Sequence, residues 1–264
     1  FIQQFLVTFD PKLSTAKRNT QLSAIKQSIS SAIDSVDTLA NEHVLATLGS
    51  LLTACVRCNW FIKSTNDPIS LKFNCSKIIG IPTPIPYREI FVFDALLEGV
   101  HIRFGKVSRG GLRWSNRIDD YRLEVFGLVK TQQTKNAVII PVGSKGVFVI
   151  KHADQSPKFA VEQYKRFIQS MLQLTDNYIN NHEHRQKKLI AHDDFDPYFV
   201  VAADKGTATF SDFANQVAID QNFWLGDGFA SGGKHGYDHK KVGITAKGAW
   251  ECCKLHFQSL NLNP

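Results

Sequence analysis

The chain has 264 residues, of which 43% are hydrophobic and 21% charged, enough for one or two domains with a buried core. It contains no run of about 18 apolar residues, so we expect no membrane span. The net charge is +7, but the basic residues are dispersed and not interleaved with aromatic residues, which argues against nucleic acid as a partner. The charge is compatible with an anionic small substrate or with a solvated basic surface.

Five cysteines are present, an odd number without the spacing of a disulfide framework, which indicates a reducing cytoplasm. Cys55 and Cys58 could be half of a zinc site, but no second such pair exists, so we interpret them as packed helix residues. The N-terminal sequence FIQQFLVTFDPK lacks an initiator methionine and a basic region. We therefore interpret the chain as an excised fragment and not as one that begins with a signal peptide.

Residues 14–62 are expected to be helical, because apolar residues recur there at helical intervals. These residues are Leu22, Ile25, Ile29, Ile33 and Val36. No catalytic arrangement occurs in this part, and we interpret residues 1–75 as a helical lead-in segment. The Pro-rich stretch 81–86 cannot be a regular helix and marks the boundary to an α/β domain at 76–242.

Residues 89–93 and 100–104 are predicted to be strands, and the segment 105–148 that follows organises the chain. It carries three separated cations, Arg109, Lys135 and Lys145. Arg109 and Lys145 each lie beside glycine, where the backbone can approach a ligand closely. The segments between the cations have the lengths of one helix and one strand, so folding back could bring all three together. Such a cluster suits a small, multiply charged anion such as a dicarboxylate.

The local signals in this segment predict a helix, a strand and a turn. Helical spacing relates Ile118, Tyr121, Val125, Leu128 and Gln132, with Ser115 and Asn116 as candidate N-caps. Gln132 and Lys135, three residues apart, share a face of that helix. Residues 137–140 are predicted to be a strand that stops at Pro141, and residues 147–150 a second short strand. Lys145 is therefore placed on the tight turn 142–146.

Further along the chain, residues 160–178 are predicted to be a helix with a broad apolar face. Residues 180–197 are polar, and we interpret their histidines and Asp193 as solvated loop residues and not as metal ligands. These histidines are His182, His184 and His192. The apolar run 198–203 predicts a buried strand, which Asp204 ends. A carboxylate at such a strand end contacts a ligand in many α/β proteins, or it caps the turn that follows.

The Gly-rich stretch 226–243 matches neither the P-loop nor the GxGxxG spacing, so we interpret it as an ordered structural loop. Its histidines are not expected to bind a metal. Residues 245–257 are predicted to be a helix. Strands that alternate with helices of roughly 10–18 residues predict an α/β fold. We expect a mixed sheet with helices on both faces, preceded by the helical segment.

Several blocks of the sequence resemble the glutamate dehydrogenases, in particular the large NAD-specific type. They are RGGLRWS, QQTKNA, PVGSKG, DPYFVVAADKGTATFSD, FWLGDGFASGG and GYDHKKVGITAKGAWE. Several long blocks in the same order are far more specific than one short pattern. The resemblance covers roughly residues 82–257 and implies the three-layer substrate domain of the amino-acid dehydrogenase type.

In the resembled enzymes, a helix such as 245–257 begins the nucleotide-binding domain. This sequence has no GxGxxG after a strand. The resemblance therefore implies that residues 243–264 are a hinge helix leading to a nucleotide-binding domain that is missing from the chain. It also implies a cofactor contact by Thr245, and we expect the fragment to be inactive alone.

The resemblance implies reversible oxidative deamination of L-glutamate to 2-oxoglutarate and ammonium, with NAD as the hydride carrier, in a homo-oligomeric parent protein. Lys145 would be the catalytic lysine, acting as a base toward water at the imine stage. Asp204 would move the proton to and from the substrate amine.

The resemblance also implies how the substrate is held. Lys135 and Gln132 would hold the α-carboxylate and Arg109 the distal one, with the backbones of Gly110 and Gly111 close to the substrate. The sequence departs from the family pattern at two places: Arg109 stands where the smaller enzymes have lysine, and Val147 where a second glycine is common.

Two other classes of function are compatible with these residues. A non-catalytic anion- or amino-acid-binding regulatory module would share the anion pocket but would not need Asp204 close to Lys145. A basic interaction domain would need its lysines and arginines on one exposed face. The separation of Lys145 and Asp204 discriminates between the catalytic and the regulatory interpretation.

Overall fold

The structure, a computed structural model, describes residues 1–133, 141–230, 234 and 239–263. The helices are α1 (Ile2–Phe9), α2 (Thr15–Asp34), α3 (Leu39–Ala54), α4 (Tyr121–Gln133), α5 (Pro157–Leu172), α6 (Ser211–Asp220), α7 (His239–Val242) and α8 (Ile244–Ser259), with short 3-10 helices η1 (Cys75–Lys77) and η2 (Gly226–Gly228). The strands are β1 (Cys55–Cys58), β2 (Ile69–Phe73), β3 (Arg88–Phe93), β4 (Leu97–Arg103), β5 (Ser108–Ser115), β6 (Val142–Ile150), β7 (Asn177–Ile179), β8 (His182–His184) and β9 (Val201–Ala203).

The described strands form one central mixed sheet and a small hairpin of β7 and β8. The order in the central sheet is β1-β2-β3-β4-β6-β5-β9. Neighbours from β1 to β6 are antiparallel, whereas β5 runs parallel to both β6 and β9. Parallel neighbours need a crossover connection, and α4 provides the one from β5 to β6. The expected mixed sheet is confirmed.

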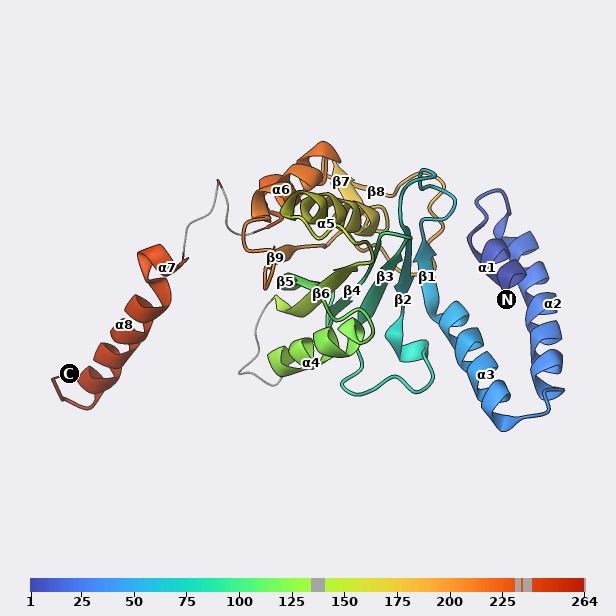
Figure 1. Cartoon of the computed structure of the whole chain (residues 1–264), viewed down its shortest axis with the longest axis horizontal. Coiled ribbons are helices and arrows are strands. Elements are labelled where there is room, and N and C mark those ends of the chain that lie inside the picture. Colours follow the sequence, from blue (N-terminus) through green and yellow to red (C-terminus); the bar gives the residue numbers. More distant parts are fainter. Residues whose placement is uncertain (134–140, 231–233, 235–238, 264) are drawn as a thin grey trace.

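Helices cover both faces of this sheet, as Figure 1 shows with α5 and α6 on one side and α4 on the other. The larger core packs α5 and α6 on residues such as Leu112 and Phe148. The smaller core packs α4 on Val147 and Val149, which alternate with Phe148 along β6. The prediction of an α/β fold with helices on both faces is therefore confirmed. Val147, one of the two departures from the resembled pattern, is fully buried under α4.

The sequence explains where the two covering helices form. Ser156 caps α5 by accepting a hydrogen bond from the Phe159 backbone N–H, and Pro157 occupies the first turn, where its missing N–H costs nothing. In α4, Tyr121, Val125 and Val129 recur at helical spacing and are buried. The candidate N-caps of α4 were wrong: Ser115 ends β5, and the helix begins at Tyr121.

Three further expectations are corrected by the structure. Helix does not extend to residue 62, because Cys55–Cys58 is strand β1, and β1 and β2 join the same sheet as β3. The helix expected at 160–178 ends at Leu172, and the β7–β8 hairpin follows. Lys145 does not lie on a turn, since β6 runs unbroken from Val142 to Ile150. The strand expected at 137–140 lies outside the described residues, as does part of the loop 226–243.

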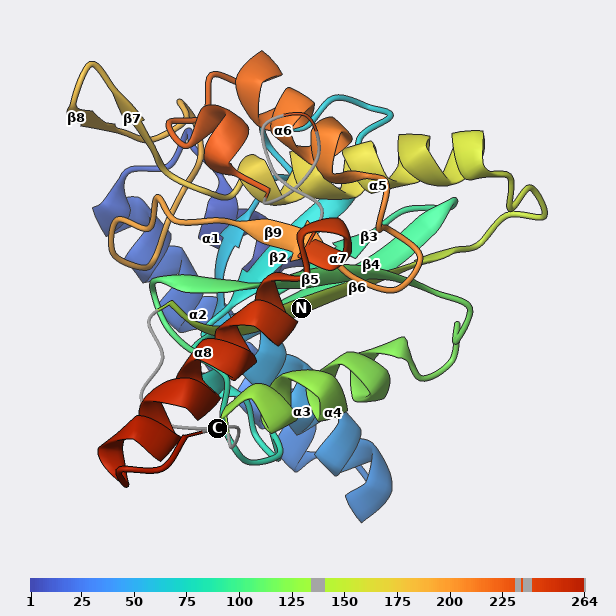
Figure 2. The ribbon, with the colours of Figure 1, turned by 90° about the vertical axis from the view of Figure 1, so that its left-hand side faces the viewer.

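Helix α8 stands apart from the sheet and its covering helices in Figure 1, and in Figure 2 the molecule is turned so that α8 faces the viewer. The helix expected at 245–257 is confirmed, and none of its residues is buried. Thr245 is exposed in its first turn. No helix in the described parts of the chain combines the length and apolarity that a membrane crossing requires.

Candidate active site

The parallel part of the sheet brings Lys145 and Asp204 into contact, although 59 residues separate them in sequence. Lys145 lies in β6, and Asp204 directly follows β9, with β5 between the two strands. The Lys145 Nζ donates a hydrogen bond of 2.6 Å to Asp204 Oδ2, and both side chains are 15% exposed. Lys145 lies on the same face of β6 as Val147 and Val149, so the pair lies on the α4 side of the sheet.

Glycine in β5 gives this pair its space. Register places Gly111 opposite Ala202, the second residue of β9. A Cβ added to Gly111 would lie 2.7 Å from the Cβ of Asp204, so no other residue fits there without displacing the carboxylate. The neighbouring Gly110 serves the sheet itself, because its Cβ would lie 1.5 Å from the Ser144 carbonyl oxygen of β6. Gly110 and Gly111 are therefore required by close packing, independently of any ligand.

The turn after β9 fixes the direction of the Asp204 side chain. Thr207 Oγ1 accepts a hydrogen bond from the Asp204 backbone N–H and donates one of 2.5 Å to the Leu112 carbonyl of β5. The Lys205 backbone N–H donates a hydrogen bond of 2.8 Å to Asp204 Oδ1. The two carboxylate oxygens thus face different partners, and Oδ2 is directed at Lys145. Asp204 belongs to this turn as well as facing Lys145.

Electrostatics favour the ionised carboxylate at Asp204. Burial acts to raise its pKa, but the hydrogen bond from Lys145 and the backbone N–H of Lys205 outweigh burial and lower the pKa below its ordinary value. Arg113 adds to the lowering from 3.4 Å away. The described site therefore holds an ionised carboxylate that is a weak base until one of its cationic partners gives up its proton or moves.

Arg113 and Glu124 are members of the site that sequence reasoning missed. Arg113 Nη1 donates a hydrogen bond of 2.7 Å to Glu124 Oε1 of α4, and Nη2 faces Asp204 Oδ1. Ser115 donates a hydrogen bond of 2.6 Å to the other oxygen of Glu124. A signal was available, since Arg113 and Arg109 are four residues apart in a strand and so project from the same face.

Of the remaining residues predicted from the sequence, the structure describes Arg109 and Gln132, and both lie near the Lys145–Asp204 pair. Arg109 lies opposite Gly143 at the start of β5 and is half-buried, and its side chain has no hydrogen bond or ion pair to any described residue. Gln132, at the end of α4, covers Gly143, whose added Cβ would lie 2.8 Å from the Gln132 Oε1. That oxygen is buried and has no hydrogen-bond partner among the described residues. Lys135 lies outside the described residues.

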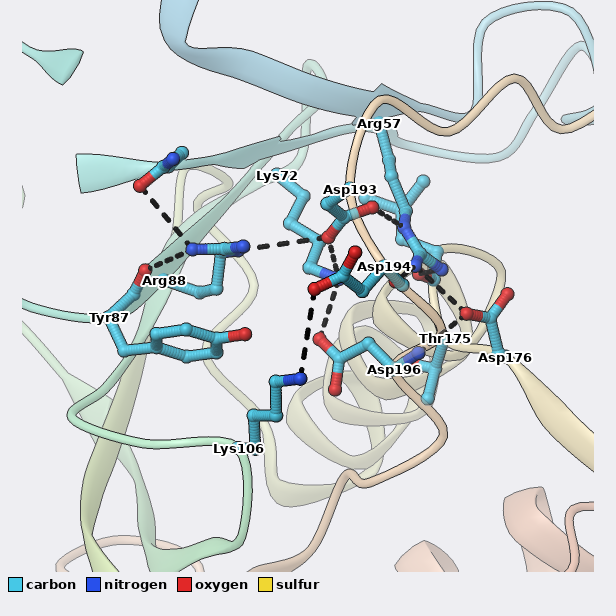
Figure 3. A network of polar contacts seen from close by, with 12 residues as sticks. Arg57, Lys72, Tyr87, Arg88, Lys106, Thr175, Asp176, Asp193, Asp194 and Asp196 are labelled. Atoms are coloured by element: carbon cyan, nitrogen blue, oxygen red, sulfur yellow. Dashed lines mark hydrogen bonds and ion pairs between the residues drawn. The ribbon is translucent and has the colours of Figure 1, made fainter. Parts of the chain in front are cut away.

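A buried ionic cluster anchors the segment that leads into β9 (Figure 3). Arg57 of β1 contacts Asp176 and Asp193 at 2.9 and 2.5 Å, and its side chain has no exposed surface. Lys72 of β2 contacts Asp193 at 2.9 Å and Asp196 at 2.7 Å, and Arg103 of β4 also contacts Asp196. The cluster joins three strands to residues 193–196, five positions before β9 begins. It thereby fixes the approach of the chain to Asp204.

This cluster corrects the interpretation of residues 180–197 as a solvated loop. The side chain of Asp193 is only 3% exposed and is paired with three cations, whereas His182 and His184 are exposed in the hairpin as expected. Burial acts to raise the pKa of Asp193, but Lys72 and Arg57 outweigh it and lower the pKa. Within the described parts of the chain, no three His, Cys, Asp or Glu side chains are placed to hold a metal ion.

The fold and the site define a lysine–aspartate ion pair at the parallel end of the sheet of an α/β domain, with a half-buried arginine and an amide oxygen that has no partner among the described residues. Residues 28–264 match the family described as the catalytic domain of bacterial NAD-glutamate dehydrogenase, and the chain belongs to this family.

The chain is similar to three bacterial proteins named NAD-specific glutamate dehydrogenase. It is 45% identical over 272 residues to the protein of Halomonas elongata and 45% over 262 residues to that of Pseudomonas aeruginosa. It is 44% identical over 280 residues to that of Mycobacterium tuberculosis. These alignments cover 99%, 96% and 99% of the chain. The chain spans only 17%, 16% and 17% of the length of these relatives.

Proposed function

We propose that this chain is the substrate-binding and acid–base part of an NAD-dependent glutamate dehydrogenase. The reaction is the reversible oxidative deamination of L-glutamate to 2-oxoglutarate and ammonium. The observation that carries the proposal is the contact of 2.6 Å between Lys145 Nζ and Asp204 Oδ2 in a member of this family. A mostly buried pair that shares one proton is suited to move protons at a reacting carbon.

Two carboxylates on the substrate require two cationic anchors. Arg109, unpaired among the described residues and half-buried on the face of β5 that also carries Arg113, is available for the distal carboxylate. Its guanidinium can hold a carboxylate through two parallel hydrogen bonds. Gln132 lies over Gly143 with a buried, unpartnered amide oxygen. The NH2 group of the same amide would donate to the α-carboxylate together with the Lys135 ammonium, so that both hold the substrate by its reacting end.

The pair then divides the proton chemistry. The Asp204 carboxylate takes a proton from the substrate ammonium, which leaves a neutral amine able to form the imine. The Lys145 amine, once its proton has passed to solvent, takes a proton from water as that water attacks the imine carbon. Asp204 then returns its proton to the amine nitrogen of the tetrahedral product, which leaves as ammonia, and the ammonia takes the hydroxyl proton as the carbonyl forms and departs as ammonium. Each group thus returns to its starting state over one turnover.

NAD is the hydride acceptor that the names of the relatives supply. A dinucleotide needs a strand, a Gly-rich turn and a helix N-terminus. In the described residues β5 leads to α4 without a glycine between Ser115 and Tyr121, so that connection does not fit the cofactor. Thr245 is exposed in the first turn of α8, a helix that has no buried residue. We therefore derive no step through NAD from this chain.

The alternatives are less well supported. A regulatory module that only binds an anion has no need of a carboxylate 2.6 Å from the anion-binding lysine, because the two charges compete with the ligand. A basic interaction domain needs exposed cations, whereas Arg57, Lys72 and Arg103 are buried in ion pairs. All five cysteines are free, as we expect for a protein of the reducing cytoplasm, where we place it.

The test is turnover of the full-length protein with Lys145→Ala and with Asp204→Asn. We expect kcat and kcat/KM with glutamate and NAD to fall by at least about a hundredfold in each variant, the usual contribution of a general acid or base. Lys151→Ala is the matched control, because Lys151 follows the same strand and is paired with Glu98 at 3.3 Å. It should leave kcat unchanged. Turnover within a few-fold of wild type in Lys145→Ala would reject the proposal.

A further inference from the structure

Arg113 has no part in the proposed chemistry, and it lies between the carboxylates of Glu124 and Asp204. Its side chain is 17% exposed, with Nη1 on Glu124 Oε1 at 2.7 Å and Nη2 facing Asp204 Oδ1 at 3.4 Å. The two partners come from different layers, since Glu124 belongs to α4 and Asp204 follows β9. Arg113 itself belongs to β5, the strand between β6 and β9. The guanidinium therefore joins the covering helix to the acid–base pair.

The Glu124 end of this arrangement is fixed by two hydrogen bonds. Arg113 donates to Oε1, and Ser115 Oγ donates to Oε2 at 2.6 Å. Ser115 lies two residues after Arg113 on the same face of β5, so strand and helix are joined twice within one short segment. A planar guanidinium held in this way has little freedom at its second amino group. The position of Nη2 beside Asp204 is thus set by the scaffold.

The contact of Arg113 with Asp204, at 3.4 Å, is longer than its contact with Glu124, at 2.7 Å. Oδ1 accepts from the Lys205 backbone N–H at 2.8 Å and faces Arg113 at 3.4 Å, whereas Oδ2 accepts from Lys145 at 2.6 Å. Rotating the carboxylate would move Oδ2 away from Lys145 and would also move Oδ1 away from its two donors, Arg113 and the Lys205 backbone N–H. Arg113 and Lys205 therefore act together against that rotation.

We propose that Arg113 is a positioning residue for the reaction, holding the Asp204 carboxylate with Oδ2 directed at Lys145. The inference rests on the proposed function, because it gives Arg113 a role only if Asp204 transfers a proton. Arg113 does not itself touch the substrate in this scheme. Its action has two parts, the orientation set through Glu124 and the favourable positive charge beside Asp204.

The charged groups around Asp204 define what a pH profile should report. Lys145 approaches from β6, Arg113 from β5, and Glu124 from α4 stands behind Arg113, while the Lys205 side chain is exposed on the turn. Removing Arg113 takes one of two cationic partners from the carboxylate, so the pKa of Asp204 should rise. A carboxylate that must be ionised then loses function at a higher pH. The acidic limb of the profile of kcat/KM should move upward by about one pH unit.

Three variants of the full-length enzyme separate orientation from charge. In Arg113→Gln we expect kcat to fall about ten- to a hundredfold, as misplaced catalytic groups do, with the upward shift of the acidic limb. Arg113→Lys keeps the positive charge but cannot bridge two carboxylates. The acidic limb of its kcat/KM profile should therefore lie at the wild-type pH, while its kcat should stay as low as in Arg113→Gln. Glu124→Gln removes the carboxylate that holds Arg113 but leaves the charge of Arg113 in place. We therefore expect kcat to fall while the acidic limb of the kcat/KM profile stays at its wild-type pH. Arg117→Gln is the control, since Arg117 is an exposed neighbour paired with Asp120, and we expect wild-type behaviour.

The outcomes distinguish this inference from the function on which it rests. Wild-type turnover in Asp204→Asn would reject the proposed function, whatever Arg113 does. A Glu124→Gln variant with wild-type kcat, or an Arg113→Gln variant whose activity falls only in proportion to its folded fraction and whose pH profile is unchanged, would overturn the positioning role. If Arg113→Gln does not fold, the other two variants decide: low kcat in both, with the acidic limb in place, supports the role.

Discussion

The Cβ that Gly111 lacks would lie 2.7 Å from the Cβ of Asp204, so the catalytic carboxylate that we propose occupies the space of a missing side chain. Real Cβ atoms do not approach so closely, and the nearest atoms of Asp204 belong to its rigid stem. Gly111→Ala should therefore push Asp204 away from Lys145. We expect kcat with glutamate to fall about a hundredfold, because a displacement of about 1 Å is enough for such a loss.

The control for this substitution is Gly127→Ala. Gly127 is exposed in the middle of α4, and a Cβ there would meet nothing within 4 Å. Alanine is favoured over glycine in a helix by about 0.5–1 kcal/mol, so the variant should be slightly more stable and fully active. Equal activity of Gly111→Ala and Gly127→Ala in steady-state assays would contradict the importance of the Gly111–Asp204 contact.

Much of this part of the fold could be predicted because its signals are local. The α4 helix, the strands β3 and β4 and the strand end at Asp204 all follow from spacing within short windows. Lys145 was misplaced because the glycines on both sides of it suggested a turn. In fact Gly143 and Gly146 lie in a strand where neighbours approach closely: Gln132 covers the first, and Leu112 Cδ1 would lie 2.7 Å from a Cβ on the second.

The buried ionic cluster, much of which Figure 3 shows, should dominate the stability of the chain. Asp196→Asn leaves Arg103 without its carboxylate and removes one of the two partners of Lys72. Breaking such a buried pair costs about 3–5 kcal/mol, which urea unfolding of the 264-residue chain at pH 7 would measure. Asp194→Asn is the matched control, because Asp194 is 87% exposed and only 3.8 Å from Lys106, and it should change the free energy of unfolding by less than about 0.5 kcal/mol. A similar loss in both variants would refute the role of the cluster.

The same cluster sets the response to acid. At Asp176 and at Asp196, burial acts to raise the pKa, but the neighbouring cations outweigh burial and lower it. The unfolded chain then binds more protons than the folded chain around pH 4, since an unperturbed aspartate has a pKa of about 3.9. The stabilisation is complete above that pH and is lost as the pH falls through the lower folded pKa. The free energy of unfolding should fall below about pH 5, and less steeply in Asp196→Asn.

This cluster could not be predicted from sequence, for a physical reason. Arg57 and Asp176 are 119 residues apart, and Lys72 and Asp196 are 124 residues apart, so no window of local sequence contains a pair. A lone aspartate in a polar stretch has the same local pattern whether it is solvated or buried. Only the fold, which places β1, β2 and β4 beside residues 193–196, reveals that these charges face one another.

Lys72 should behave differently from the carboxylates. Burial, reinforced by Arg57 and Arg103 against Asp196, lowers the pKa of Lys72 to about 8. An unperturbed lysine has a pKa of about 10.4, so the folded chain releases the proton first and its stability rises with pH between about 8 and 10. Lys72→Met should abolish this rise. Because Asp193 keeps Arg57 and Asp196 keeps Arg103, the variant should lose less than about 1.5 kcal/mol at pH 7. A loss as large as that of Asp196→Asn would contradict this.

The last prediction concerns Arg109 and the choice of substrate. Arg109 is half-buried at the start of β5 and has no ion-pair partner among the described residues, so a substrate carboxylate would be its partner. Losing one member of such a pair costs roughly 2–5 kcal/mol, because the other charge is left unpaired. In the full-length enzyme, Arg109→Ala should therefore lower kcat/KM for glutamate by more than about tenfold, since each 1.4 kcal/mol is a factor of ten.

Norvaline provides the comparison, because it has the length of the glutamate chain without the distal carboxylate. The Arg109→Ala substitution should leave kcat/KM for norvaline nearly unchanged or raise it, since the variant removes an unpaired cation that norvaline cannot neutralise. Arg117 is exposed and follows the same strand, so Arg117→Ala should leave kcat/KM unchanged for both substrates. Equal losses for glutamate and norvaline in Arg109→Ala would mean that the arginine only supports the strand around Gly110 and Gly111, and the assignment to the distal carboxylate would be wrong.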